Sequence, residues 1–220
     1  EVEKEKLYNF LREMEFNRLL SQAISFYGES ENSNIKKNNT TVKDLKINTK
    51  AYECITEEKD LNKWLDILNE KSVIAVDTET TSLNPLEANL VGISFSYAPN
   101  KACYIPLEHK NNKGLKKDIV LKKIKPILED ISIKKVGQNI KFDFIILKQN
   151  GININSIEDT MLISYTLDAG TNRHNLDTLA DIHLNHKTIS YKDVVGSGKN
   201  KINFSEVPID QATEYAAEDA

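Results

Sequence analysis

Residues 73–76, Val-Ile-Ala-Val, form a continuous apolar run that leads directly into Asp77-Thr78-Glu79. Four apolar residues in succession, two of them valines, predict a strand that is buried on both faces of a sheet. Such strands are typical of α/β domains, in which helices cover both faces of the sheet. Polar groups at the carboxyl end of such a strand lie where open α/β sheets commonly bind their ligands. The run therefore indicates both a fold class and the place of a functional site.

The segments that follow the run predict the rest of a mixed sheet. Residues 90–97 and 102–107 have strand patterns, and a turn signal, Pro-Asn-Lys, lies between them. Three neighbouring strands joined by short turns favour antiparallel pairing. We expect further strands at 134–137 and around 157, and helices at 61–68, 142–147, 160–167, 175–184 and from 208 onwards. The pattern predicts an α/β domain with a mixed β-sheet flanked by helices.

The N-terminal part has a different composition. Residues 1–26 carry apolar side chains at spacings of three and four, which predicts one amphipathic helix. Residues 28–50 are mostly Ser, Asn, Lys and Thr, a composition typical of a linker. We therefore expect an N-terminal helix with a polar linker at 1–50 and a folded domain at 51–220.

The overall charge and cysteine content exclude some classes of protein. With 33 acidic and 29 basic residues, the net charge is −4, which argues against a protein that coats nucleic acid through bulk positive charge. Two cysteines cannot form a disulfide framework and fit a reducing cytosol, so we expect a cytoplasmic protein. No apolar run approaches the roughly 18 residues of a membrane span. The missing initial Met suggests an excised fragment.

Asp77 and Glu79 are the first candidates for chemistry. Side chains two apart on a strand point to the same side, so both carboxylates should emerge together. A chain of this composition contains about five acid-x-acid pairs by chance. The simpler alternative is a solvated strand end at which Thr80 and Ser82 begin a turn. Attachment to a strand with no other polar residue favours the functional interpretation.

Two further polar groups are expected on helices. Asn139 and Asp143 are four residues apart where a strand ends and a helix begins, so they share one face. A helix cap for Asn139 and a favourable first-turn charge for Asp143 are simpler explanations. Tyr215 and Asp219 are also four apart, on the last helix, where two alanines between them allow a close neighbour. Each group is a weak signal by itself.

Together, the three groups resemble the motifs of the DEDD superfamily of 3′→5′ exonucleases, in the subtype with Tyr in its third motif. Over roughly residues 51–220 the chain is similar to the proofreading exonuclease domain family of bacterial DNA polymerase I. The similar stretches are VDTETTSLNPLEANLVGISFS, KVGQNIKFD, DTMLISYTLDAGTNRHNLDTLA and EYAAEDA. The leading helix, with LREMEFNRLL, resembles the segment that joins the 5′-nuclease module to that domain. The resemblance implies a ribonuclease H-like fold, and a monomeric fragment without the polymerase domain of its full-length chain.

The resemblance also implies a cofactor, a reaction and catalytic roles. It implies two divalent metal ions, Mg²⁺ or Mn²⁺, which hard oxygen ligands favour. One ion would be held by Asp77, Glu79 and Asp219. The second would sit on Asp77, with Asp143 reached through water, and Tyr215 would orient the attacking water. The implied reaction releases nucleoside 5′-monophosphates from the 3′ end of DNA.

Contacts to the substrate are implied in the same way. The expected partner is a single-stranded DNA 3′ end, which apolar side chains can bind without reading its bases. By position, Leu83 and Phe204 resemble the family's wedge residues, although Leu83 could equally be a core residue. The implied polar contacts to the strand are Gln138, Asn139 and Arg173; a guanidinium in a polar loop also suits phosphate by its geometry.

Two other functions stay open at this point. An RNA 3′-end nuclease of the ribonuclease D type has the same motif set, although the long match with the polymerase family argues against it. A catalytically silent DNA-binding or spacer module is the alternative from a different class. The presence of all four acidic residues favours activity over the silent module.

Overall fold

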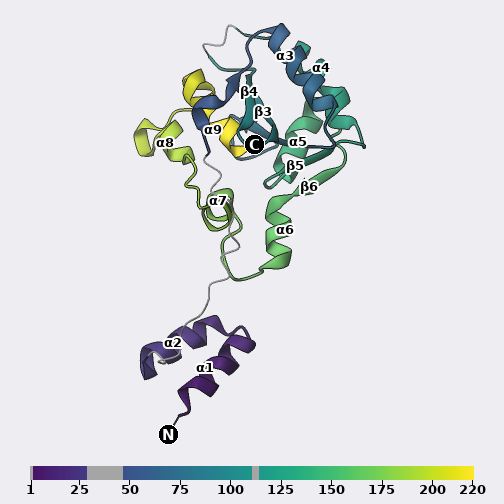
Figure 1. The fold of residues 1–220 in the computed structure, drawn as a ribbon. Coiled ribbons are helices and arrows are strands. Elements are labelled where there is room, and N and C mark those ends of the chain that lie inside the picture. Colours follow the sequence, from purple (N-terminus) through teal and green to yellow (C-terminus); the bar gives the residue numbers. More distant parts are fainter. Residues whose placement is uncertain (1, 29–46, 111–113) are drawn as a thin grey trace. The chain divides into compact units, whose positions relative to one another are not determined.

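The computed structural model describes residues 2–28, 47–110 and 114–220 of the chain (Figure 1). The chain divides into two compact units, Glu1–Thr41 and Val42–Ala220. The predicted linker falls almost wholly on residues 29–46, outside the described residues. Among the helices that are described, none is long and apolar enough to cross a membrane.

The N-terminal unit contains two helices where the sequence pattern predicted one. Helix α1 spans Lys4–Glu13 and helix α2 spans Asn17–Tyr27. The chain turns at Glu15, whose φ of 54° lies in the left-handed region. The buried Tyr8 hydroxyl donates a hydrogen bond to the carbonyl of Gly28, at 2.6 Å. The prediction of a single helix was wrong. Apolar residues continue at helical spacing on both sides of the turn, so the spacing does not reveal that one residue between them is left-handed.

The C-terminal unit is built on a six-stranded mixed sheet in the order β1-β4-β3-β2-β5-β6. Strands β2, β3 and β4 pair antiparallel, as predicted, whereas β5 and β6 extend the sheet in parallel from β2, and β1 lies parallel to β4. The strands are β1 Glu53–Cys54, β2 Val73–Thr80, β3 Leu90–Ala98, β4 Lys101–Pro106, β5 Lys134–Gly137 and β6 Ile157–Asp159. Strand β1 was not predicted, because two residues are too few to show a period.

The C-terminal unit also contains helices. They are α3 Glu58–Asn69, α4 Lys117–Glu129, α5 Lys141–Gln149, α6 Thr160–Leu167, α7 Leu176–Leu184, α8 Tyr191–Val195 and α9 Ile209–Asp219. Three short 3₁₀ turns are η1 Thr49–Ala51, η2 Gly198–Asn200 and η3 Phe204–Glu206. In Figure 1, α3 and α4 lie side by side, and α9 contacts β4, β3, β2 and β1. The predicted α/β class is thereby confirmed.

Alternate strand residues enter two separate apolar clusters. On β4, Cys103 and Ile105 belong to the larger cluster, which also contains the buried residues of α3, α4 and α5. Tyr104, between them, belongs to the smaller cluster with Phe204 of η3 and Ala216 of α9. Because successive side chains of a strand point to opposite faces, the two clusters cover the two faces of the sheet. The side of α9 is the one on which the candidate site is built.

Candidate active site

Strand β2 has one apolar face and one acidic face near its carboxyl end. Ile74 and Val76 are buried in the larger cluster, so Asp77 and Glu79 point the other way, toward α9. One carboxylate oxygen from each of Asp77, Glu79 and Asp219 lies within 4.8 Å of the other two. Within residues 2–28, 47–110 and 114–220 this is the single group of three acids, histidines or cysteines arranged to hold a metal ion.

Asp143 reaches the same strand from α5. Its Oδ1 accepts hydrogen bonds from the backbone N–H of Thr78, at 3.0 Å, and from the Thr78 hydroxyl. Thr78 alternates with Asp77 and Glu79, so its side chain points to the face that α5 covers. Asp143 is only 2% exposed and lies outside the group of three carboxylates that meet within 4.8 Å. It is therefore the fourth acid of the site and approaches β2 separately.

Burial and neighbouring acidic groups raise the pKa values of all four site carboxylates. Burial, and then the charges of the neighbouring acids, hold the pKa values of Asp77 and Glu79 well above their ordinary range. Burial raises the pKa of Asp143 to about 7 and that of Asp219 to about 7. Like charges close together in a poorly solvated site resist ionisation, and a bound cation removes that penalty. The donor set thus favours a divalent cation with oxygen ligands.

Tyr215 lies one helical turn before Asp219 on α9, and its hydroxyl donates a hydrogen bond to the Asp219 carboxylate. Burial, followed by the charges of Asp219 and Glu79, raises the pKa of Tyr215 above its ordinary value. The phenol therefore keeps its proton at neutral pH, and it can donate hydrogen bonds but cannot act as a free base.

A cavity of about 350 Å³ opens beside these residues. Leu83 and Tyr191 line it together with Phe142, Tyr215 and the carboxylates of β2 and α9. Leu83 is 84% exposed, so the alternative of a core residue is excluded. Tyr191 was not predicted as a site residue, because one aromatic residue in a polar segment carries no pattern. Its place becomes visible only when α8 is folded against α9.

Phe204 is not among the residues that line this cavity. Its side chain is 1% exposed and lies in the smaller apolar cluster. The Phe204 ring is stacked with that of Tyr191 (centroids 6.3 Å apart, planes at 8°) and lies 5.9 Å from that of Tyr215. The structure thus places Phe204 as a support behind two residues of the cavity wall.

The predicted polar contacts also lie outside the cavity lining. Gln138 is held on both sides of its amide, since its Nε2 donates to the His174 carbonyl at 2.7 Å and its Oε1 accepts from the Thr160 hydroxyl at 2.5 Å. Asn139 is exposed with φ of 57°, and its side chain does not cap α5. Arg173 is exposed next to His174. Gln138 therefore joins the end of β5 to the loop that carries Arg173.

A larger cavity, about 650 Å³, lies between α5, β6 and α6. Its lining is mainly apolar and includes Phe144, Leu162 and Leu167, and it contains none of the four site carboxylates. The carboxylates make the smaller cavity the chemically competent one.

The sequence has clear relatives. Residues 52–220 match a family described as 3′-5′ exonuclease. The chain is 43% identical over 196 residues to DNA polymerase I of Rhizobium leguminosarum. This match covers 80% of this chain and 19% of that protein. It is 36% identical over 227 residues to DNA polymerase I of Pseudomonas aeruginosa. This match covers all of this chain and 24% of that protein. The chain thus spans about a fifth to a quarter of the length of these relatives.

Solved structures share the fold at lower identity. The EXO domain of Aedes aegypti Nibbler has a TM-score of 0.62 at 14% identity, covering 80% of this chain and 84% of that one. Escherichia coli RNase D, an exoribonuclease, has a TM-score of 0.60 at 18% identity, covering 77% of this chain and 41% of that one. These likenesses show a DEDD-type exonuclease fold. By its family match and its polymerase relatives, the chain belongs to the 3′-5′ exonuclease domain family of DNA polymerase I.

Proposed function

We propose that this chain is a two-metal-ion exonuclease that removes nucleoside 5′-monophosphates from the 3′ ends of single-stranded DNA. The observation that carries the proposal is the meeting of Asp77, Glu79 and Asp219 within 4.8 Å, beside a cavity that Tyr215 lines. No basic side chain is among the described residues that line this cavity, so the acidic charge has no protein counterion there. That imbalance fits a site built for cations.

The carboxylates divide into two sets of proposed ligands. Asp77, Glu79 and Asp219 would hold one divalent ion, Mg²⁺ or Mn²⁺. Asp77 would share a second ion with Asp143, which acts through water because it stands apart from the group of three. When bound, two such metal ions would activate water as Lewis acids and stabilise the charge that develops in phosphoryl displacement.

The chain's own residues orient the reactants. Tyr215 keeps its proton, so its hydroxyl can donate to Asp219 or hold the attacking water in line with the phosphorus atom. Thr78 fixes the carboxylate of Asp143 through two hydrogen bonds. The proton released by the attacking water leaves to solvent, because the phenol cannot take it.

The substrate contacts follow from the cavity walls. Leu83 and Tyr191, which both line the cavity, would offer apolar surface to the terminal bases, and such contacts tolerate any base. Gln138, Asn139 and Arg173 would contact the strand upstream of the terminal nucleotide. Phe204, predicted as a direct contact, would contribute through Tyr191, which it supports from behind.

DNA is favoured over RNA as the substrate class. The relatives at 36% and 43% identity are DNA polymerases, whereas the likeness to an exoribonuclease is at 18% identity and concerns the fold. In this proposal the chain acts as the proofreading part of a full-length DNA polymerase I in the bacterial cytoplasm, as a monomer, on frayed primer ends supplied by the polymerase domain.

The test is degradation of a 5′-labelled single-stranded DNA in Mg²⁺ or Mn²⁺, with an RNA of the same sequence beside it. We expect stepwise shortening of the DNA from its 3′ end, abolished by EDTA and by Asp77→Ala. Asp66→Ala removes an exposed acid on α3 and serves as the matched control, with activity expected to be unchanged. An intact DNA ladder with a folded protein would support the silent module, and faster shortening of RNA would support the ribonuclease D alternative.

A further inference from the structure

The loop that carries Leu83 is closed mainly by its own hydrogen bonds. It leaves the sheet after β2, and Thr81 and Asn89 pair at its base: the Thr81 N–H donates to the Asn89 carbonyl at 3.0 Å, and the Asn89 N–H donates to the Thr81 hydroxyl at 2.9 Å. From outside the loop, the Asn203 side chain donates to the Thr81 carbonyl at 2.8 Å. Asn203 is 122 residues away in sequence, so this contact joins two distant segments.

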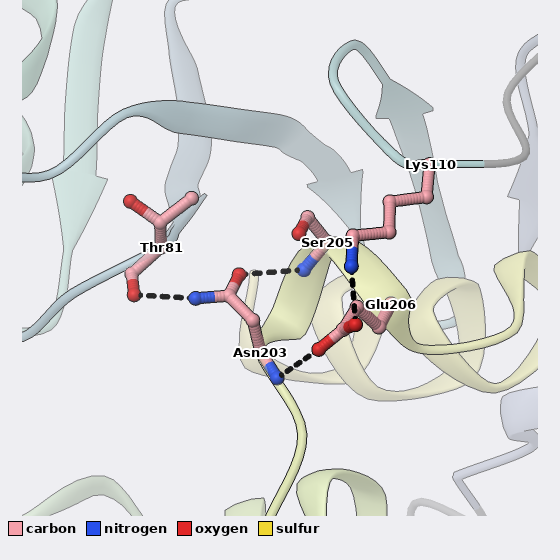
Figure 2. Close-up of polar contacts among 5 residues, drawn as sticks. All are labelled: Thr81, Lys110, Asn203, Ser205 and Glu206. Atoms are coloured by element: carbon pink, nitrogen blue, oxygen red, sulfur yellow. Dashed lines mark hydrogen bonds and ion pairs between the residues drawn. The ribbon is translucent and has the colours of Figure 1, made fainter.

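The same Asn203 amide also organises the turn that carries Phe204. Its Oδ1 accepts from the Ser205 N–H at 3.0 Å, while the Asn203 N–H donates to the Glu206 carboxylate at 2.9 Å, which completes a capping box around η3. Figure 2 shows the amide between its two partners, with its nitrogen toward Thr81 and its oxygen toward Ser205. One side chain therefore holds both the loop of Leu83 and the turn of Phe204.

The turn is anchored independently at its other end. Lys110, after β4, forms an ion pair with Glu206 (Figure 2). Its backbone N–H also donates to the Ser205 carbonyl at 2.9 Å. With η3 fixed in this way, the buried Phe204 ring supports Tyr191 by stacking. The position of Tyr191 in the cavity lining thus depends on η3, and the contact between Asn203 and Thr81 ties the loop of Leu83 to the same turn.

We propose that Asn203 is a positioning residue that sets the separation of Leu83 and Tyr191, two residues of the cavity lining. The inference rests on the proposed function, because it makes this separation a determinant of how firmly the 3′-terminal nucleotide is held. The metal ligands on β2 are fixed by the sheet itself, with Asp77 paired to Ser94 and Glu79 to Gly92. A change at Asn203 should therefore affect substrate binding more than chemistry.

Asn203→Ser separates the two roles of this side chain. Serine is a good helix N-cap, so it can still accept from the Ser205 N–H, but its side chain is too short to reach the Thr81 carbonyl. Glu206→Gln is the matched control on the same turn. Glutamine can keep the capping box, and the backbone hydrogen bond from Lys110 to Ser205 still anchors the turn, so only the ion pair with Lys110 is lost and the contact with Thr81 is untouched.

The experiment measures kcat and KM on single-stranded DNA for the wild type and both variants, together with oligonucleotide affinity by fluorescence anisotropy in Ca²⁺. For Asn203→Ser we expect KM and the dissociation constant to rise about three- to tenfold, the size of a partly lost base-stacking contact. Its kcat and thermal midpoint should stay near wild type, and Glu206→Gln should leave KM unchanged.

Unchanged KM and affinity in Asn203→Ser, or an equal rise in Glu206→Gln, would overturn the positioning role while the exonuclease proposal stands. A fall in kcat without a change in KM in Asn203→Ser would also overturn the positioning role. Wild-type protein that binds DNA without degrading it would refute the proposed function, and the affinities of the variants would still decide the role of Asn203. Wild-type protein that does not bind DNA would refute both.

Discussion

The carboxylate of Asp143 accepts two hydrogen bonds from Thr78, the residue that separates the two acids of β2. This contact links α5 to the strand that holds Asp77 and Glu79, across 65 residues of sequence. The fourth acid is therefore held by the backbone of the strand that presents the first two. Any shift of α5 against β2 changes the geometry of the whole site.

Replacing Asp143 should reduce turnover far more than DNA binding. Asp143→Asn keeps the shape of the side chain and an oxygen acceptor for Thr78 but removes the charge that would act on the second ion. We expect kcat to fall by about 100-fold or more, the order found when one electrostatic stabiliser of a transition state is lost. Single-turnover kinetics beside anisotropy measurements test this, with Asp66→Asn as the charge-matched control. Equal losses of binding and turnover would make Asp143 a structural residue.

Thr78→Val should weaken the link between β2 and α5. Valine has nearly the same shape as threonine but lacks the hydroxyl donor, so the buried carboxylate of Asp143 loses one partner. We expect the free energy of unfolding to fall by about 1–3 kcal/mol in a buffer where Asp143 is ionised. Thr78→Ser restores the hydroxyl and should recover most of the loss in urea titrations. A serine variant no more stable than the valine variant would count against this hydrogen bond.

The pKa values predict how stability depends on pH. The pKa values of Asp143 and Asp219 are raised to about 7 in the folded state, against about 3.9 for an unperturbed Asp. The folded state thus favours the protonated form, and the resulting stability is complete below about pH 4 and is lost as pH rises through about 7. In EDTA, we expect these two groups to lower the thermal midpoint as pH rises from about 4 to about 7. Asp143→Asn should flatten the dependence, and a wild-type-like slope in that variant would contradict its assignment.

Divalent ions should reverse this trend. They bind the ionised carboxylates of the folded protein, so they compete with protons and stabilise more as pH rises. Calorimetry at a fixed Mn²⁺ concentration should show a larger increase of the thermal midpoint near pH 8 than near pH 6. Asp219→Asn should reduce that increase, since it removes one ligand from the group of three. An equal increase at both pH values would exclude binding to these acids.

Substitution of Tyr191 should mainly affect KM, whereas substitution of Phe204 should mainly affect stability. Tyr191 lines the cavity, so Tyr191→Ala should raise KM about tenfold, by the loss of a stacking contact. Tyr191→Phe keeps the ring and should stay near wild type. Phe204 is buried, and Phe204→Ala should cost about 3–5 kcal/mol of stability. Steady-state kinetics and denaturant titrations separate the two effects; a large KM effect with full stability in Phe204→Ala would restore it as a direct contact.

The mixed sheet and the strand of the first two acids could be predicted from sequence because their patterns are local. Val-Ile-Ala-Val before Asp77 indicates a buried strand, and the two-residue period puts Asp77 and Glu79 on one side. The helical spacing of Tyr215 and Asp219 is local in the same sense. The turn at the left-handed residue Glu15 was not predicted, because one backbone angle does not change the spacing of the apolar residues around it.

Tertiary structure alone decided which side chains reach the cavity. Leu83 and Phe204 are both apolar residues in short irregular segments, yet one is 84% exposed and the other 1%. The difference arises because η3 packs Phe204 into the smaller apolar cluster behind Tyr191, whereas the loop after β2 leaves Leu83 exposed in the lining of the cavity. Sequence determines the period and polarity of each element. Burial depends on which distant elements pack together, and contacts such as that of Asn203 with Thr81 exist only in the folded chain.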